Sequence, residues 1–272
     1  MGIFIRDAGL ALGGVSVGAD NVTEAQVDGV QFFPTASDPK PLDPDTYVND
    51  TFEDEINRNL INHTPVLDVV GNGWQRLLNS PETLLCRYGG VLPGGNRSIS
   101  IARLGWHAAC YNVLTRSEHV IDVTGMSALD PLRPVSRTRA FFAADPINFF
   151  WPTAIFASDP ATGYYDGITI EGDGIWLRQY TTGQILTPLK TVTWAPGIQL
   201  VLIDVNRNNS TGDIQAFVEA YDANGSVLQT EDTGLYSSYT PSAGVSVNYP
   251  GIETASRGSC GCFSFRASPI SA

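Results

Sequence analysis

Residues 164–180 read YYDGITIEGDGIWLRQY, and this stretch gives the clearest indication of the fold class. Residues 164–170 and 175–180 show the two-residue alternation that is typical of a half-buried β-strand. The Glu171-Gly172-Asp173-Gly174 segment between them favours a tight turn, because glycine tolerates the backbone angles that such turns need. The stretch therefore predicts an antiparallel β-hairpin.

Similar alternating segments, separated by turn signals, recur on both sides of this hairpin. They lie at 98–104, 119–123, 138–142, 198–205, 214–221, 226–228, 245–247 and 262–265. Short strands at regular spacing are the mark of an all-β sandwich. The low content of Lys and Glu, with abundant Gly, Thr, Asn and aromatic residues, also argues against a helical protein.

The first 46 residues differ from the rest in composition. Residues 1–33 are rich in Gly and Ala and too sparse in apolar residues for a core of their own, and residues 34–46 carry four prolines among Asp and Ser. Because each proline restricts φ and removes a hydrogen-bond donor, this segment favours an extended connector. We predict an N-terminal arm and linker at 1–46 and one β-sandwich domain at 47–272.

Length and charge exclude several classes of protein. A chain of 272 residues can bury a large core without disulfides, and its apolar runs are far shorter than the ~20 residues of a membrane-spanning helix. The first residues lack the features of a secretion signal. The formal net charge is −12 and Lys and Arg form no cluster, so phosphate backbones are repelled. We expect no membrane insertion, no secretion signal and no nucleic-acid partner.

The order of the segments over residues 50–267 resembles the concanavalin A-like (laminin-G-like) jelly roll. The resemblance rests on Gly71-Asn72-Gly73-Trp74 near the first strand, on the central hairpin with Trp176, and on residues 217–227 with Phe263-Ser264-Phe265. This fold hosts lectins, glycan hydrolases and structural modules, so the resemblance speaks for the fold more than for the function. Such a domain behind a short Gly- and Pro-containing arm also looks like bacteriophage virion proteins.

The resemblance implies a non-enzymatic virion structural protein: a capsid decoration protein, a head fibre or a tail-associated protein. It would assemble in the host cytoplasm, contact other virion proteins and form a homo-oligomer, with host-surface glycans as candidate ligands. One alternative is a lectin-like carbohydrate-binding module. A second alternative, which the residues support less, is a glycoside hydrolase.

Three aromatic residues are the candidate carbohydrate-binding residues. An exposed ring can stack on the apolar face of a sugar while neighbouring polar groups bind its hydroxyls. Tyr236 and Tyr239 lie in a Gly- and Ser-rich stretch, where we expect both rings to be exposed, and Trp106 precedes a histidine.

Four residues make up a candidate calcium site. Asp204, Asn206 and Asn208 offer oxygen ligands at alternate positions, as an EF-hand loop does, and Asp213 follows. The pattern departs from the EF-hand at Asn209, where glycine is expected. It departs again at the twelfth position, which lacks the bidentate Glu. The residues therefore indicate a weak calcium site or a polar hairpin loop, and no other cofactor is implied.

Two patterns that suggest catalysis carry little weight. Glu171 and Asp173 resemble part of the Glu-x-Asp-x-x-Glu pattern of β-glucanases, but Trp176 stands at the third acidic position and the glycines favour a turn. Ser16 lies in a Gly-x-Ser-x-Gly match within the sparse arm, where a nucleophile elbow has no strand and helix to hold it. We predict no catalytic residues and no enzymatic activity.

Overall fold

The computed structural model describes most of the chain after residue 150 and shorter stretches before it. The described residues are 16–17, 20–21, 25–27, 30–32, 46, 48–50, 52, 58–59, 62–68, 74–77, 85–87, 98–100, 105–111, 135–143, 151–208, 210–222, 225–247, 249–256 and 261–270. These residues form strands, turns and loops and no α-helix. A search of the same residues for a long apolar helix that could cross a bilayer finds none.

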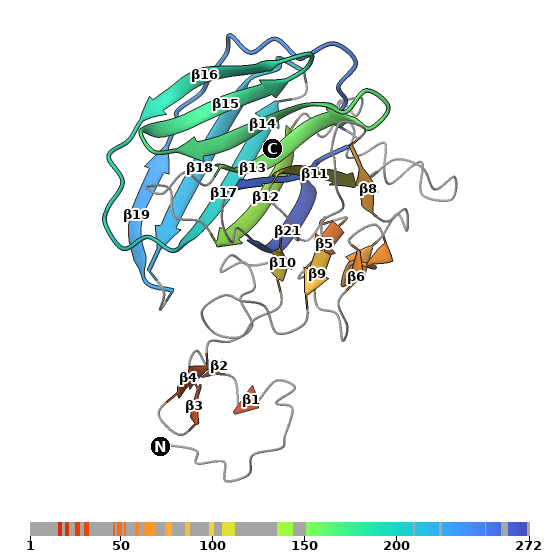
Figure 1. Cartoon of the computed structure of the whole chain (residues 1–272). Helices are drawn as coiled ribbons and strands as arrows, with labels where there is room; N and C mark the ends of the chain where they lie inside the picture. The colour runs from red at the N-terminus through yellow and green to blue at the C-terminus, as the bar shows by residue number, and fades with distance from the viewer. Residues whose placement is uncertain are drawn as a thin grey trace.

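Two antiparallel sheets pack face to face (Figure 1). The seven-stranded sheet has the order β16-β15-β14-β13-β20-β11-β8. Its strands are β8 (Trp74–Arg76), β11 (Gly105–Tyr111), β13 (Trp151–Asp159), β14 (Tyr164–Glu171), β15 (Gly174–Tyr180), β16 (Gln184–Thr191) and β20 (Gly251–Ser256). The predicted hairpin is confirmed as β14 and β15, and it lies near one edge of this sheet.

The ten-stranded sheet has the order β19-β18-β17-β12-β21-β10-β9-β6; in addition, β5 pairs with β21, and β7 pairs with β5. Its strands are β5 (Val48–Asp50), β6 (Arg58–Asn59), β7 (Leu67–Asp68), β9 (Leu85–Arg87), β10 (Ser98–Ser100), β12 (Val135–Ala143), β17 (Leu200–Asn208), β18 (Ile214–Tyr221), β19 (Val227–Asp232) and β21 (Gly261–Ile270). The prediction of a mainly β, antiparallel sandwich is confirmed. The predicted strand at 119–123 lies outside the described residues, and at 245–247 only an isolated bridge forms, between Ser246 and Ser158.

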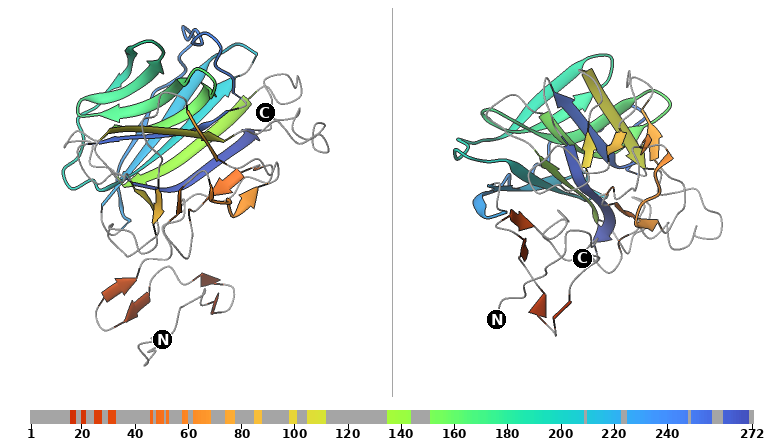
Figure 2. Two further views of the ribbon diagram at one scale, coloured as in Figure 1. Left: turned by 45° about the vertical axis from the view of Figure 1, so that its right-hand side comes forward. Right: turned by 60° about the horizontal axis from the view of Figure 1, so that its bottom comes forward.

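Four short strands in the first 46 residues form two small hairpins. Strand β1 (Ser16–Val17) pairs with β2 (Asp20–Asn21), and β3 (Ala25–Val27) pairs with β4 (Val30–Phe32). In Figure 1 and Figure 2 both hairpins lie apart from the two large sheets. The boundary between an arm and a domain at residue 46 stays a prediction.

The core lies between the inner faces of the two sheets. Ile168 and Ile170 of β14 and Leu177 of β15 pack in one cluster with Val201 of β17 and Val218 of β18. Because side chains alternate along a strand, residues 165, 167, 169 and 171 of β14 face the other way, and so do 176, 178 and 180 of β15. These residues make up the outer face of the seven-stranded sheet, where the candidate site lies.

A segment after β19, residues 233–247, crosses from one sheet to the other. Its first part bonds to β18, where the backbone of Tyr236 exchanges hydrogen bonds with Ile214. Its later part bonds to the seven-stranded sheet, where Gln179 Nε2 of β15 donates to the carbonyl of Thr240. We call residues 233–247 the crossing segment, because it links both sheets along one edge of the sandwich.

Candidate functional site

An ion pair is buried on the outer face of the seven-stranded sheet. Arg178 of β15 is 0% exposed and Glu253 of β20 is 1% exposed, and Arg178 Nη2 lies 3.3 Å from Glu253 Oε1. Strands β14 and β13 lie between them. The residue of β14 opposite Arg178 is Gly167, so no β14 side chain lies directly beside the guanidinium.

Gly167 is also required by the close approach of β13. A Cβ atom at this position would lie 2.6 Å from Thr153 Cγ2 and 2.9 Å from the carbonyl oxygen of Ala154. The register between β13 and β14 shifts just after Ile155, which is the partner of Gly167. The path of Arg178 over β14 therefore depends on a glycine at this position.

The Glu253 carboxylate is held by two further donors. Its Oε2 accepts hydrogen bonds from Tyr165 Oη at 2.5 Å and from Thr153 Oγ1 at 3.1 Å. Buried charges are tolerated when they are paired and hydrogen-bonded in this way. Burial lowers the pKa of Arg178, but the attraction of Glu253, with smaller contributions from Tyr165 and Glu171, outweighs it and raises that pKa. The arginine therefore remains charged.

Aromatic rings border this ion pair. The Tyr180 ring stacks on the Tyr165 ring with 5.3 Å between centroids and 9° between planes. Burial, followed by the nearby Glu253 carboxylate, raises the pKa of Tyr165 well above its usual value, so it acts as a neutral donor. Tyr180 is half-buried, which leaves part of its ring on the surface.

Glu171 and Trp176 lie on the same outer face, where the β14–β15 hairpin turns. Trp176 of β15 is paired with Thr169 of β14, and Glu171 lies two residues after Thr169 on β14. The side chains of Trp176 and Glu171 are therefore diagonal neighbours on one face. Within the described part of the chain, Glu171 Oε1 and Trp176 Nε1 are buried and have no hydrogen-bond partner. Such atoms are rare in folded proteins and call for an explanation.

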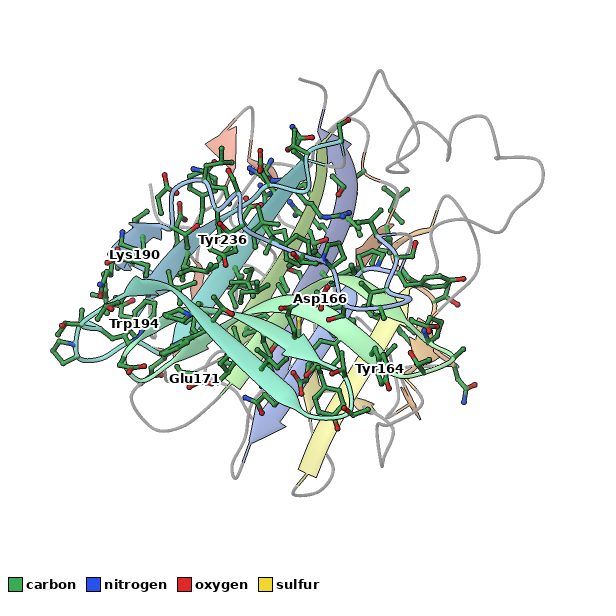
Figure 3. The ribbon with its side chains drawn as sticks, turned by 90° about the horizontal axis from the view of Figure 1, so that it is seen from above. Tyr164, Asp166, Glu171, Lys190, Trp194 and Tyr236 are labelled. Carbon is green, nitrogen blue, oxygen red and sulfur yellow. The ribbon has the colours of Figure 1, made fainter. Side chains whose placement is uncertain are left out.

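A buried tryptophan holds the backbone of Glu171 in place. Trp194 is 6% exposed and donates from Nε1 to the backbone carbonyl of Glu171 at 2.8 Å, and Figure 3 shows the two residues together. Burial is the largest cause that raises the pKa of the Glu171 carboxyl; the charge of Asp173 adds to it and Arg178 opposes it.

The edge strand β16 adds an apolar side chain to this face. Pro188 is exposed and pairs with Trp176, so the two side chains share a face. A proline at a sheet edge offers no N–H to an incoming strand and so discourages strand addition there. We call Glu171, Trp176, Arg178 and Pro188 the hairpin site.

The predicted exposed pair of tyrosines does not form, because Tyr239 is buried. Tyr239 is 7% exposed, its ring meets Phe156 edge-on at 5.5 Å, and its hydroxyl donates to Asp166 Oδ2 at 2.5 Å. Tyr236 is half-buried and packs against the core. The expectation of exposure fails because the Gly- and Ser-rich stretch belongs to the crossing segment, which packs along the edge of the sandwich. Trp106 lies in β11 opposite Ala255, and its side chain lies outside what the structure describes.

The predicted calcium ligands lie mostly on a strand, because β17 continues to Asn208. Both carboxylate oxygens of Asp204 accept hydrogen bonds from arginines, at 2.7 and 2.6 Å from Arg137 and at 3.1 and 2.9 Å from Arg139. Asn208 Oδ1 accepts from the backbone N–H groups of residues 210 and 211, and Asp213 Oδ2 accepts from Thr211 Oγ1. Asn206 Oδ1 is buried and has no partner in the described chain.

These four residues do not fit a calcium ion in this arrangement. The Asp204 carboxylate is neutralised by Arg137 and Arg139, and the side chains of Asn208 and Asp213 stabilise the loop that follows β17. Among the described residues, no three His, Cys, Asp or Glu side chains come together as metal ligands would.

Glu171 and Asp173 do not form a pair on one strand. Glu171 ends β14 on the outer face, and Asp173 is exposed in the turn. Two residues of the outer face, Arg178 and Glu253, were not among the predicted site residues. Arg178 could have been noticed as an outward residue of the predicted hairpin, whereas nothing near Glu253 in the sequence points to its partner.

Comparisons with known proteins identify no family for this chain. No protein-family model and no curated protein matches the chain. Among solved structures, the globular domain of T. cruzi calreticulin is similar with 7% identity and a TM-score of 0.44, over 83% of this chain and 88% of that domain. The CBM2 module of the evolved Dit protein of Lactobacillus casei BL23 phage J-1 is similar with 7% identity and a TM-score of 0.39, over 84% and 96%. Peanut lectin is similar with 11% identity and a TM-score of 0.36, over 80% and 99%.

Proposed function

We propose that the chain is a carbohydrate-binding module whose ligand rests on the outer face of the seven-stranded sheet at the hairpin site. The observation that carries this proposal is the pair of buried polar atoms without partners, one an acceptor on Glu171 and one a donor on Trp176. Adjacent hydroxyl groups of a sugar supply both a donor and an acceptor. The Trp176 ring and Pro188 offer an apolar surface for the sugar ring.

A ligand at the site requires side chains to rotate, because both unpartnered atoms are buried. Both side chains are half-buried, so part of each is on the surface. The terminal torsion of Glu is soft, and a turn about it brings Oε1 toward a ligand at little cost. The backbone beneath is held by Trp194 and by strand pairing, so little conformational entropy is lost on binding.

The role in a virion stays a prediction. It depends on the arm and linker at 1–46, most of which lies outside the described residues. If the chain does form a homo-oligomer, several weak hairpin sites would bind a surface glycan together more firmly than one site alone. Binding without turnover is also part of the proposal, so a bound glycan is expected to be recovered intact.

The test is a glycan array with the purified full chain, followed by calorimetric titration of the glycans that bind. Trp176→Ala should weaken binding by at least about tenfold, since stacking and one hydrogen bond are lost together. Ile185→Ala is the matched control, because Ile185 is 55% exposed on the neighbouring strand and its side chain lies on the opposite face from Trp176. An array without any binder, or equal affinities for Trp176→Ala and wild type, would overturn the proposal.

A further inference from the structure

We infer that the hairpin site selects uncharged glycans and rejects acidic ones; this inference rests on the proposed function. It follows from the charges that surround Glu171 and Trp176. A glycan that carries uronic acid, sialic acid or sulfate groups needs a cation at the site to replace the water that it loses. The described strands β14, β15 and β16 carry two cations, Arg178 and Lys190.

Both of these cations are already engaged by carboxylates. Arg178 is fully buried beside Glu253, at 3.3 Å. Lys190 Nζ lies 2.6 Å from Glu231 Oε2 and also donates to the backbone carbonyl of Asp232 on β19. Neither ion pair leaves a net positive charge for an acidic sugar.

Among the residues that the structure describes, the remaining charges at the site are negative. Glu171 ends β14 within the site, and Asp173 is exposed in the adjoining turn. An anionic group placed against Trp176 would therefore face two carboxylates, while the net charge of −12 on the whole chain adds a repulsive field. A neutral sugar meets no such repulsion, because its hydroxyl group donates to Glu171 Oε1 and another accepts from Trp176 Nε1.

The experiment compares matched pairs of probes by calorimetry at pH 8, because alkaline conditions favour the ionised form of Glu171. The probes are tetrasaccharides of galactose, glucose and mannose, each with its uronic-acid counterpart. In every pair that binds, the neutral member is expected to bind at least tenfold more tightly. The ratio of the two affinities, neutral member over acidic member, should decrease in 1 M salt, because salt screens charge repulsion.

Two variants separate charge from contact. Glu171→Gln keeps an acceptor oxygen and removes the charge, so it should narrow the ratio between neutral and acidic members. Trp176→Ala should weaken both members by a similar factor and leave the ratio unchanged. If acidic members bind as tightly as neutral ones or more tightly, the inference fails while the proposed function stands. If no member of any pair binds and the array is also empty, the proposed function itself fails.

Discussion

The hydroxyl of Tyr165 donates a 2.5 Å hydrogen bond to Oε2 of Glu253, a residue 88 positions later in the chain. This bond joins β14 to β20 across β13. Together with the Arg178–Glu253 ion pair it places a buried, charged cluster on the outer face of a sheet, where alternation alone predicts solvent-facing residues.

Glu253→Gln should destabilise the fold strongly. The substitution leaves the Arg178 guanidinium buried without its carboxylate, and breaking a buried ion pair in this way costs about 3–5 kcal/mol. Denaturant unfolding followed by circular dichroism measures the loss. Glu231→Gln is the control, since Glu231 forms an ion pair with the partly exposed Lys190 and should cost less than about 1 kcal/mol. If both variants lose the same free energy of unfolding, the Arg178–Glu253 ion pair is not buried as described.

Gly167→Ala should lower the free energy of unfolding by about 2 kcal/mol or more, because the new methyl group meets the backbone oxygen of Ala154 at 2.9 Å. The matched control is Gly183→Ala, where a Cβ atom meets nothing within 4 Å. This control should change stability by no more than about 0.5 kcal/mol. Thermal melts of both variants measure the change in stability. If Gly167→Ala is as stable as the wild type, β13 and β14 are not packed this closely.

Tyr239→Phe should cost about 1–2 kcal/mol, since it removes the donor to the buried Asp166 carboxylate. Asp166 still accepts from the backbone N–H and the hydroxyl of Ser242, so the fold should persist. Tyr236→Phe serves as the control, because no hydrogen bond of the Tyr236 hydroxyl is found among the described residues. Urea titrations that give the same midpoint for both variants would argue against the link between the crossing segment and β14.

Calcium should leave the melting temperature unchanged, whether it is added to metal-stripped protein or removed by a chelator. The physical reason is that both carboxylate oxygens of Asp204 already accept hydrogen bonds, Oδ1 from Arg137 and Oδ2 from Arg137 and Arg139. Differential scanning calorimetry at millimolar calcium provides the measurement. A rise of several degrees would show that the residues around Asp204 rearrange to bind the ion.

Glu171 should make stability depend on pH in a defined direction. Its pKa is raised above the ordinary value of 4.5 by burial, so the folded state holds the proton more tightly than the unfolded state does. The favourable contribution of the protonated group is fully present below pH 4.5 and is lost as the pH rises through the folded pKa. The free energy of unfolding of Glu171→Gln, taken relative to that of the wild type, should therefore be higher at pH 7 than at pH 4. Denaturant unfolding of both proteins at the two pH values measures this difference. A constant difference would contradict the raised pKa.

The local elements of this protein follow from its amino-acid sequence. The alternation at 164–180 produced the β14–β15 hairpin, and residues 214–221 form β18 as predicted, because a two-residue period and a turn are properties of neighbouring residues. The mainly β fold followed from the repetition of such segments.

Which of these residues come into contact depends on how the strands pair and the sheets pack. Strand β17 continues past the predicted end at residue 205 because β12 supplies a partner as far as Asn208, and the Asp204 carboxylate thereby meets two arginines instead of a metal. Tyr239 is buried because the crossing segment lies against Asp166. Arg178 reaches Glu253 across β14, where the residue beside it is Gly167 and has no side chain. Each of these contacts joins residues far apart in the chain, and their energy depends on burial and mutual distance, which arise only when the sheets have packed.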